Sequence, residues 1–235
     1  EKYPFSQWSK VMRETLSYRE EELLRTAPFK GVKELREEIA AYLYRNRGMQ
    51  VSSDCILIGA GTEYLYGRLL ELLPADSIYA AEDPGYRKIT KLYEGHGAPF
   101  RYVPVDGEGI CVGALRESGA SVVHVSPGYH FPLGFVMPVG RRQALLAWAR
   151  EESERYIIED DYDCELRYFG HPAPAIQSMD INHRVIYFNT FSKMLAPSLR
   201  VSYMVLPPKL MDRYVQKMNY YSNTVSSFEQ YAVAS

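Results

Sequence analysis

The sequence has 235 residues, of which 46% are hydrophobic and 24% charged, values typical of a globular rather than a disordered chain. Its net charge of −2, from 27 Lys and Arg against 29 Asp and Glu, argues against a protein that binds nucleic acid over its whole surface. No apolar run reaches the ~18 residues that a membrane-spanning helix needs, and the three cysteines form no C-x-x-C pair. We therefore expect a cytoplasmic protein with no membrane association and no zinc ribbon or other metal site.

Helical and strand-like segments alternate along the chain. The spacing of apolar residues predicts helices at residues 34–47, 64–73, 87–94, 139–152 and 209–221, and Gly48 ends the first of them. Short apolar runs predict strands at residues 56–58, 77–81, 101–105, 121–125, 156–158, 185–188 and 201–206. This alternation predicts an α/β fold, namely a three-layer α/β/α sandwich around a mostly parallel sheet. The last strand, reached by a short turn after Arg200, is the candidate for an antiparallel one.

Polar residues stand directly after five of these predicted strands. They fall at positions 61–62, 83–86, 126–134, 160–163 and 190–193. In parallel sheets ligands bind at the carboxyl ends of the strands. We therefore expect these residues to gather along one edge of the sheet.

Lys193 is the strongest candidate for chemistry. It follows a predicted buried strand and stands near the hydroxyls of Thr190 and Ser192. A lysine in a partly dry site loses its proton more readily, which imine chemistry requires. Arg200 follows seven residues later and, with the two hydroxyls, can hold a phosphate. A solvated loop lysine is the ordinary alternative for an isolated Ser-Lys pair.

Acidic residues follow the strand at 156–158. A carboxylate at the end of an apolar strand, such as Asp160, is costly unless it has a cationic partner. A protonated pyridine nitrogen would be such a partner. The rival interpretations are a magnesium site made of Asp160, Asp161 and Asp163, and a solvated acidic turn.

Three further features have both a functional and an ordinary interpretation. The turn at 59–63 offers backbone N–H groups at a helix N-terminus to a single phosphate, or is simply a tight turn. Tyr86 is placed to stack on a planar ligand or to cap the core. His130 can reach a ligand, but a surface or structural role is more common.

Taken together, these segments resemble pyridoxal-phosphate enzymes of the aspartate aminotransferase fold (fold type I, class I and II). They are more similar still to the aminotransferase-like domain of MocR/GabR-type regulators, which join this domain to a GntR-type winged helix-turn-helix. The resemblance covers nearly the whole chain and rests on residues 35–43, 46–48, 82–86, 131–134, 159–163 and 190–200. The seven-residue step from Lys193 to Arg200, with Pro197 inside it, favours the regulator subgroup.

The resemblance implies a role for each site residue. Lys193 would form the internal aldimine with pyridoxal 5'-phosphate and later move the proton. Asp160 would pair with the ring nitrogen and Tyr162 with the ring hydroxyl, so these three are the expected catalytic residues. Tyr86 would stack on the ring. The phosphate would be held by the turn and the residues around the lysine: Gly61, Thr62, Glu63, Thr190, Ser192 and Arg200.

Some positions depart from the family pattern. Ser202 stands where relatives usually have glycine, and Phe131 stands where aminotransferases usually have asparagine. The stretch at 24–28 lacks the tyrosine that reaches the neighbouring subunit's phosphate in many relatives. We divide the chain into an N-terminal helical arm, residues 1–30, and a cofactor-binding large domain, residues 31–235. We expect the C-terminal small domain and the winged helix to be absent, and little transaminase activity as a result.

The main functional hypothesis is a regulator domain that binds the cofactor and senses or converts an amino compound, as a homodimer. The fragment itself is not expected to bind nucleic acid. A free-standing class I/II aminotransferase is the alternative. A magnesium-dependent phosphate-binding protein is a third reading, from another class.

Overall fold

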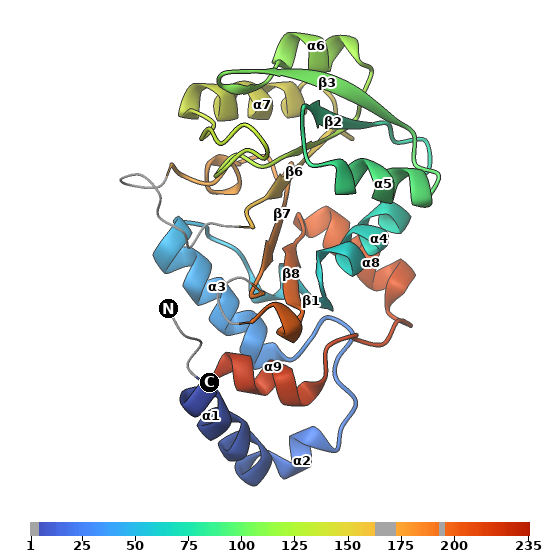
Figure 1. Ribbon diagram of the computed structural model, residues 1–235. Helices are drawn as coiled ribbons and strands as arrows, with labels where there is room; N and C mark the ends of the chain where they lie inside the picture. The colour runs from blue at the N-terminus through green and yellow to red at the C-terminus, as the bar shows by residue number, and fades with distance from the viewer. Residues whose placement is uncertain (1–4, 163–172, 193–195) are drawn as a thin grey trace.

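The computed structural model describes residues 5–162, 173–192 and 196–235, and the strands in these ranges form one eight-stranded sheet (Figure 1). The strands are β1 (Ile56–Ala60), β2 (Tyr79–Asp83), β3 (Phe100–Asp106), β4 (Gly109–Ile110), β5 (Val122–Val125), β6 (Tyr156–Asp160), β7 (Val185–Thr190) and β8 (Val201–Val205). Their order across the sheet is β1-β8-β7-β6-β5-β2-β3-β4. The sheet thus extends through most of the described chain.

The sheet is mostly parallel, as the sequence predicted. β2 pairs in parallel with β3 and β5, and β6 pairs in parallel with β5 and β7. β8 lies antiparallel between β1 and β7, with Ile56 opposite Val205 and Thr190 opposite Ser202. Only ten residues separate β7 from β8, fewer than a parallel crossover needs. The antiparallel strand predicted at 201–206 is therefore confirmed.

Helices connect these strands and cover both faces of the sheet. They are α1 (Phe5–Tyr18), α2 (Glu20–Leu23), α3 (Lys33–Arg47), α4 (Thr62–Leu72), α5 (Arg87–Gly95), α6 (Val112–Glu117), α7 (Val139–Arg150), α8 (Pro208–Met218) and α9 (Ser227–Ala234). Short 3-10 turns add Ser53–Cys55, Gln177–Met179 and Pro197–Leu199. α3 ends where the sequence predicted, because Gly48 takes the left-handed conformation (φ 64°) that stops a helix.

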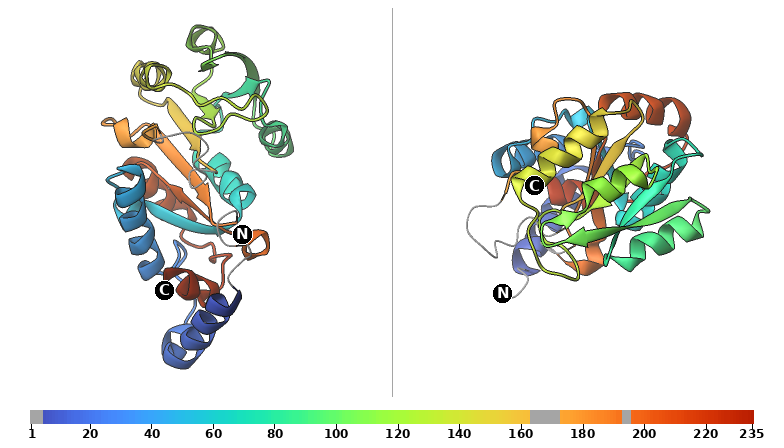
Figure 2. Two further views of the ribbon diagram at one scale, coloured as in Figure 1. Left: turned by 60° about the vertical axis from the view of Figure 1, so that its left-hand side comes forward. Right: turned by 90° about the horizontal axis from the view of Figure 1, so that it is seen from above.

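The core forms two layers, one on each face of the sheet. Tyr156 and Ile158 of β6 pack with α4, α5 and α8, whereas Ile157 between them packs with α6 and α7 on the opposite face. α3 and α9 extend this second layer over β1, β7 and β8. Figure 2 shows α3 and α4 on opposite sides of the sheet. The three-layer α/β/α architecture is thus confirmed.

Two elements differ from the sequence prediction. Residues 106–109 were predicted as a turn, but Gly109 begins β4, which pairs Ile110 with Val105. α6 was not predicted at all. Both elements are short, with two and six residues, so they carry too little periodic pattern to be recognised.

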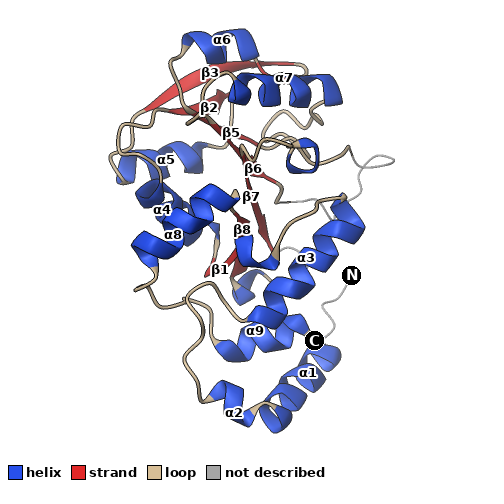
Figure 3. Cartoon of the chain, turned by 180° about the vertical axis from the view of Figure 1, so that it is seen from behind, coloured by secondary structure: helices blue, strands red, loops and turns tan. Residues whose placement is uncertain are grey.

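The N-terminal helices pack against the last helix of the described chain. α1 and α2 contact α9, and the Arg19 guanidinium lies 4.7 Å from the centre of the Tyr231 ring. Figure 3 shows the three helices together at one end of the molecule. The described part of the arm predicted at 1–30 thus packs against α9, and the division of the chain at residue 30 stays a prediction. None of the described helices combines the length and apolar character that a membrane crossing requires.

Candidate functional site

The carboxyl ends of β1, β2, β5, β6 and β7 meet at one edge of the sheet, and antiparallel β8 begins there. A cavity of about 370 Å³ opens at this edge, here called the strand-end cavity. Its lining comprises Thr62, Glu63, Tyr86, Lys88, Ser126, Phe131, Asp160, Tyr162, Thr190, Ser192, Arg200 and Ser202. Eight of the ten predicted site residues are among them. Of the other two, Gly61 adjoins the lining, and Lys193 lies outside the described residues.

Asp160 is the last residue of β6 and turns its carboxylate to the strand-end cavity. Its side chain is largely buried, and Oδ1 has no hydrogen-bond partner among the described residues. Oδ2 lies 3.5 Å from His124 Nε2, on the neighbouring strand β5. A buried carboxylate oxygen without a donor is costly. The site is therefore incomplete without a donor from a ligand in the cavity.

Asp161 points away from Asp160 into the protein. Its Oδ2 lies 2.7 Å from Arg47 Nη2 and accepts a hydrogen bond of 2.7 Å from the Tyr187 hydroxyl. Consecutive residues at the end of a strand face opposite sides of the sheet, which explains the separation. Asp163, the third carboxylate of the magnesium interpretation, lies outside the described residues. In the described chain no group of three acidic, histidine or cysteine side chains is arranged to hold a metal.

Gly61 lets the turn between β1 and α4 approach Arg200 closely. Gly61 has φ 91°, and a Cβ built there would lie only 2.3 Å from Arg200 Nη2. Arg200 itself adopts a left-handed conformation (φ 53°) just before β8. Its Nη2 donates to Glu63 Oε2 at 2.6 Å. The backbone amides at the start of α4 and the arginine thus face the same part of the cavity, an arrangement suited to an anion.

Three hydroxyls beside Arg200 form a hydrogen-bonded group. Thr190 Oγ1 lies 3.1 Å from Ser192 Oγ and accepts a hydrogen bond of 2.9 Å from Ser202 Oγ. The Ser192 backbone N–H also donates to Thr190 Oγ1. Ser202, noted in the sequence only as a departure from the family, was thus missed as a site residue. The β7–β8 register puts it directly opposite Thr190.

Three aromatic residues, Tyr86, Phe131 and Tyr162, form the wall of the strand-end cavity. The Tyr162 hydroxyl donates to the Tyr129 carbonyl at 3.0 Å, which fixes the ring at the cavity. Tyr86 is 45% exposed, and its ring meets Phe131 edge to face, with centroids 6.0 Å apart. Tyr86 is therefore only partly covered, and its ring is accessible to a planar ligand. Phe131 was not predicted as a site residue.

Glu82 and His130 form a buried pair behind this wall. Glu82 Oε2 lies 3.4 Å from His130 Nε2, and the His130 ring stacks on Phe135 with centroids 4.5 Å apart. Burial raises the pKa of Glu82 to about 8, although a hydrogen bond from the Ser126 backbone lowers it in part. Burial and the nearby His124 lower the pKa of His130. Both groups are therefore neutral at pH 7, and His130 is not among the residues that line the strand-end cavity.

We expect Glu82→Gln to stabilise the protein at alkaline pH. The folded-state pKa lies above the value of 4.5 for an exposed glutamate, so the unfolded chain ionises first as the pH rises. Stability is thus lost between about pH 4.5 and 8, and glutamine removes this loss. The gain in unfolding free energy should be on the order of 4 kcal/mol at about pH 8.5 and about 1 kcal/mol at about pH 5. Urea denaturation at both pH values measures it, and an equal effect at both would contradict the assignment.

The comparisons with known proteins agree with this geometry. The profile of the family described as aminotransferase class I and II matches residues 1–235, so the chain belongs to that family. It is 41% identical over 232 residues to the uncharacterized HTH-type transcriptional regulator YdeL of Bacillus subtilis, covering 99% of this chain and 50% of that protein. It is 33% identical over 213 residues to the probable rhizopine catabolism regulatory protein MocR of Rhizobium meliloti, covering 90% and 43%.

Solved aminotransferases have the same fold. LysN, an α-aminoadipate aminotransferase of Thermus thermophilus solved with N-(5'-phosphopyridoxyl)-L-leucine, superposes with a TM-score of 0.86 at 25% identity. The match covers 99% of this chain and 60% of LysN. The chain thus spans about half the length of the curated relatives named above and about three-fifths of this enzyme. The expected family, and pyridoxal phosphate as its cofactor, are confirmed.

Proposed function

We propose that the chain is the pyridoxal-phosphate-binding, aminotransferase-like part of a transcriptional regulator, and that it senses or converts an amino compound. The observation that carries the proposal is the buried, unpartnered Oδ1 of Asp160, which faces a cavity that also holds Arg200 and a group of hydroxyls. The similarity to two regulators at 41% and 33% identity supports the regulator over the free enzyme. A cytoplasmic homodimer is part of the same proposal.

The described residues fit the cofactor at both of its ends. Asp160 offers a carboxylate oxygen to the protonated ring nitrogen, which would fill its missing hydrogen bond. Tyr162 lies at the same wall for the ring hydroxyl, and Tyr86 is exposed for stacking on the ring. The phosphate would meet two kinds of donor: backbone N–H groups at the start of α4, in the turn of Gly61, Thr62 and Glu63, and the side chains of Thr190, Ser192 and Arg200.

The chemistry divides between the cofactor and the chain. When bound, the cofactor supplies an electron-withdrawing ring that stabilises negative charge on the carbon next to the substrate's nitrogen. Asp160 keeps the ring nitrogen protonated, because a nearby carboxylate favours the charged form. Lys193 supplies the amine for covalent attachment and, once released, accepts and returns the proton at that carbon. Arg200 and the hydroxyls fix the phosphate, so that the ring cannot turn away from Asp160.

An absorbance titration tests the proposal. The purified chain, mixed with pyridoxal phosphate, should develop the visible absorbance of a protein-bound chromophore, and borohydride should fix the cofactor to the peptide that contains Lys193. Magnesium should not alter the titration. A chain that stays colourless and unlabelled would contradict the proposal.

The free-standing aminotransferase is the second candidate, because the solved neighbours include aminotransferases such as LysN. The loaded chain can be mixed with amino acids while keto-acid release is measured. A spectral change without release supports sensing, whereas repeated release supports the enzyme.

A further inference from the structure

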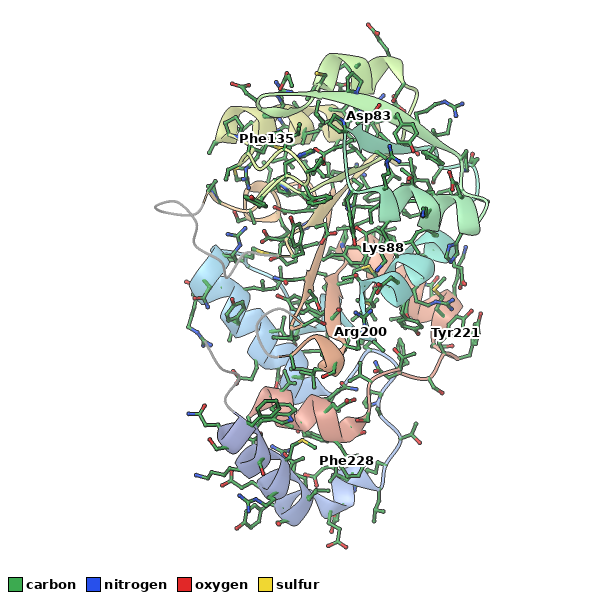
Figure 4. The ribbon with its side chains drawn as sticks, viewed as in Figure 1. Asp83, Lys88, Phe135, Arg200, Tyr221 and Phe228 are labelled. Carbon is green, nitrogen blue, oxygen red and sulfur yellow. The ribbon has the colours of Figure 1, made fainter. Side chains whose placement is uncertain are left out.

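Glu63 joins two cations at the rim of the strand-end cavity. One carboxylate oxygen accepts a hydrogen bond from Arg200 Nη2 at 2.6 Å, and the other accepts one from the Lys88 ammonium. Lys88 comes from α5, Glu63 from the first turn of α4, and Arg200 from the position just before β8. Figure 4 shows Lys88 and Arg200 in the same central region of the molecule. The three side chains form an unbranched chain of ion pairs, here called the Lys88–Glu63–Arg200 chain.

Glu63 keeps its negative charge under all ordinary conditions. Partial burial raises the pKa of its carboxyl, but the hydrogen bond from Lys88 and the charges of Lys88 and Arg200 outweigh burial and lower the pKa to about 2. Its place in the first turn of α4 also favours an acid, because the helix dipole is positive there. The Glu63 carboxyl group therefore stays ionised near neutral pH.

This permanent charge is a difficulty for a phosphate site. A phosphate monoester carries about −1.5 to −2 charges at pH 7. The side-chain charges of Glu63 and Arg200 alone would sum to zero, which would leave only neutral donors facing a dianion. With Lys88 the charges of the three side chains sum to +1, so the rim of the cavity stays positively charged. Lys88 stands only two residues after Tyr86, so a single turn presents a ring-stacking residue and a cation to the same cavity.

We propose that Lys88 is a phosphate-positioning residue. Its positive charge offsets the negative charge of Glu63, so that the positive charge of Arg200 is not cancelled and attracts the cofactor phosphate. The inference rests on the proposed function, because it presumes that a phosphate-bearing cofactor enters the strand-end cavity. Lys88 acts through Glu63 and Arg200 and through its own charge at the rim. Glu63 in turn holds both cations in place, since it contacts each of them.

A double-mutant cycle with two ligands tests this inference. The affinities of pyridoxal phosphate and of pyridoxal, which lacks the phosphate, are measured by absorbance for the unmodified chain, Lys88→Ala, Glu63→Gln and the double variant. Lys88→Ala should weaken binding of pyridoxal phosphate about tenfold and leave pyridoxal nearly unchanged. The double variant should return to within about threefold of the unmodified chain, because removing the acid also removes the need for the compensating lysine.

A neighbouring lysine provides the control. Lys91 lies on the same helix, is exposed and does not line the cavity, so Lys91→Ala should leave both affinities unchanged. If Lys88→Ala weakens both ligands equally, or if the double variant binds as weakly as Lys88→Ala, the charge-offset role is wrong while the proposed function stands. If the unmodified chain binds neither ligand, the proposed function fails and this inference fails with it.

Discussion

Replacing Lys193 with alanine is expected to abolish the cofactor that borohydride fixes to the chain. Alanine has no amine to attach, so no covalent link can form at this position. Reversible binding should persist, because Asp160 and the phosphate donors around Arg200 remain. The expected result is therefore a complete loss of trapped cofactor with a weakened but measurable absorbance titration.

Two controls sharpen this experiment. Lys209 is an exposed lysine of α8 that forms an ion pair with Glu154 and does not line the strand-end cavity. Lys209→Ala should therefore leave trapping unaffected. Lys88 is a described lysine that lines the strand-end cavity, so peptide mapping of the trapped product must separate it from Lys193. Trapping that persists in Lys193→Ala, with the label on Lys88, would overturn the assignment of Lys193.

Features that follow from regular periodicity could be predicted from the sequence. Short apolar runs alternating with helical segments predicted the parallel sheet, and the ten-residue step before β8 was too short for a crossover. The same logic predicted that residues after the strands would gather at one edge, because parallel strands end together. β4 and α6 could not be predicted, because neither is long enough to show a periodic pattern of apolar residues.

Contacts between distant segments could not be predicted in the same way. Arg47 and Asp161 meet in the core, although over a hundred residues separate them, and nothing in the acidic run marks Asp161 as the buried partner. Lys88 was missed because its role depends on Glu63 of another helix. Ser202 was missed because its contact with Thr190 depends on the β7–β8 register, which places the two residues opposite each other.

We expect Asp160→Asn to preserve the fold and to destabilise the protonated form of the ring nitrogen of the bound cofactor. A neutral amide cannot stabilise the positive charge of the ring, so the pKa of the ring nitrogen should fall. Losing one charge-assisted hydrogen bond corresponds to about 1.5–3 kcal/mol, and the affinity should drop about tenfold or more. Covalent trapping should remain, because Lys193 is intact. The pH dependence of the bound cofactor's absorbance reports the change.

The adjacent carboxylate provides a matched control, because the same substitution at Asp161 removes a charge from a different environment. Asp161→Asn removes the buried carboxylate charge that contacts Arg47 and Tyr187, which should lower the unfolding free energy by about 3 kcal/mol. In contrast, Asp160 lies 3.5 Å from the His124 imidazole and forms no ion pair with an arginine or lysine among the described residues, so Asp160→Asn should not lower the stability of the cofactor-free chain. If the absorbance of the bound cofactor responds equally to both substitutions, Asp160 is not the residue that faces the ring nitrogen.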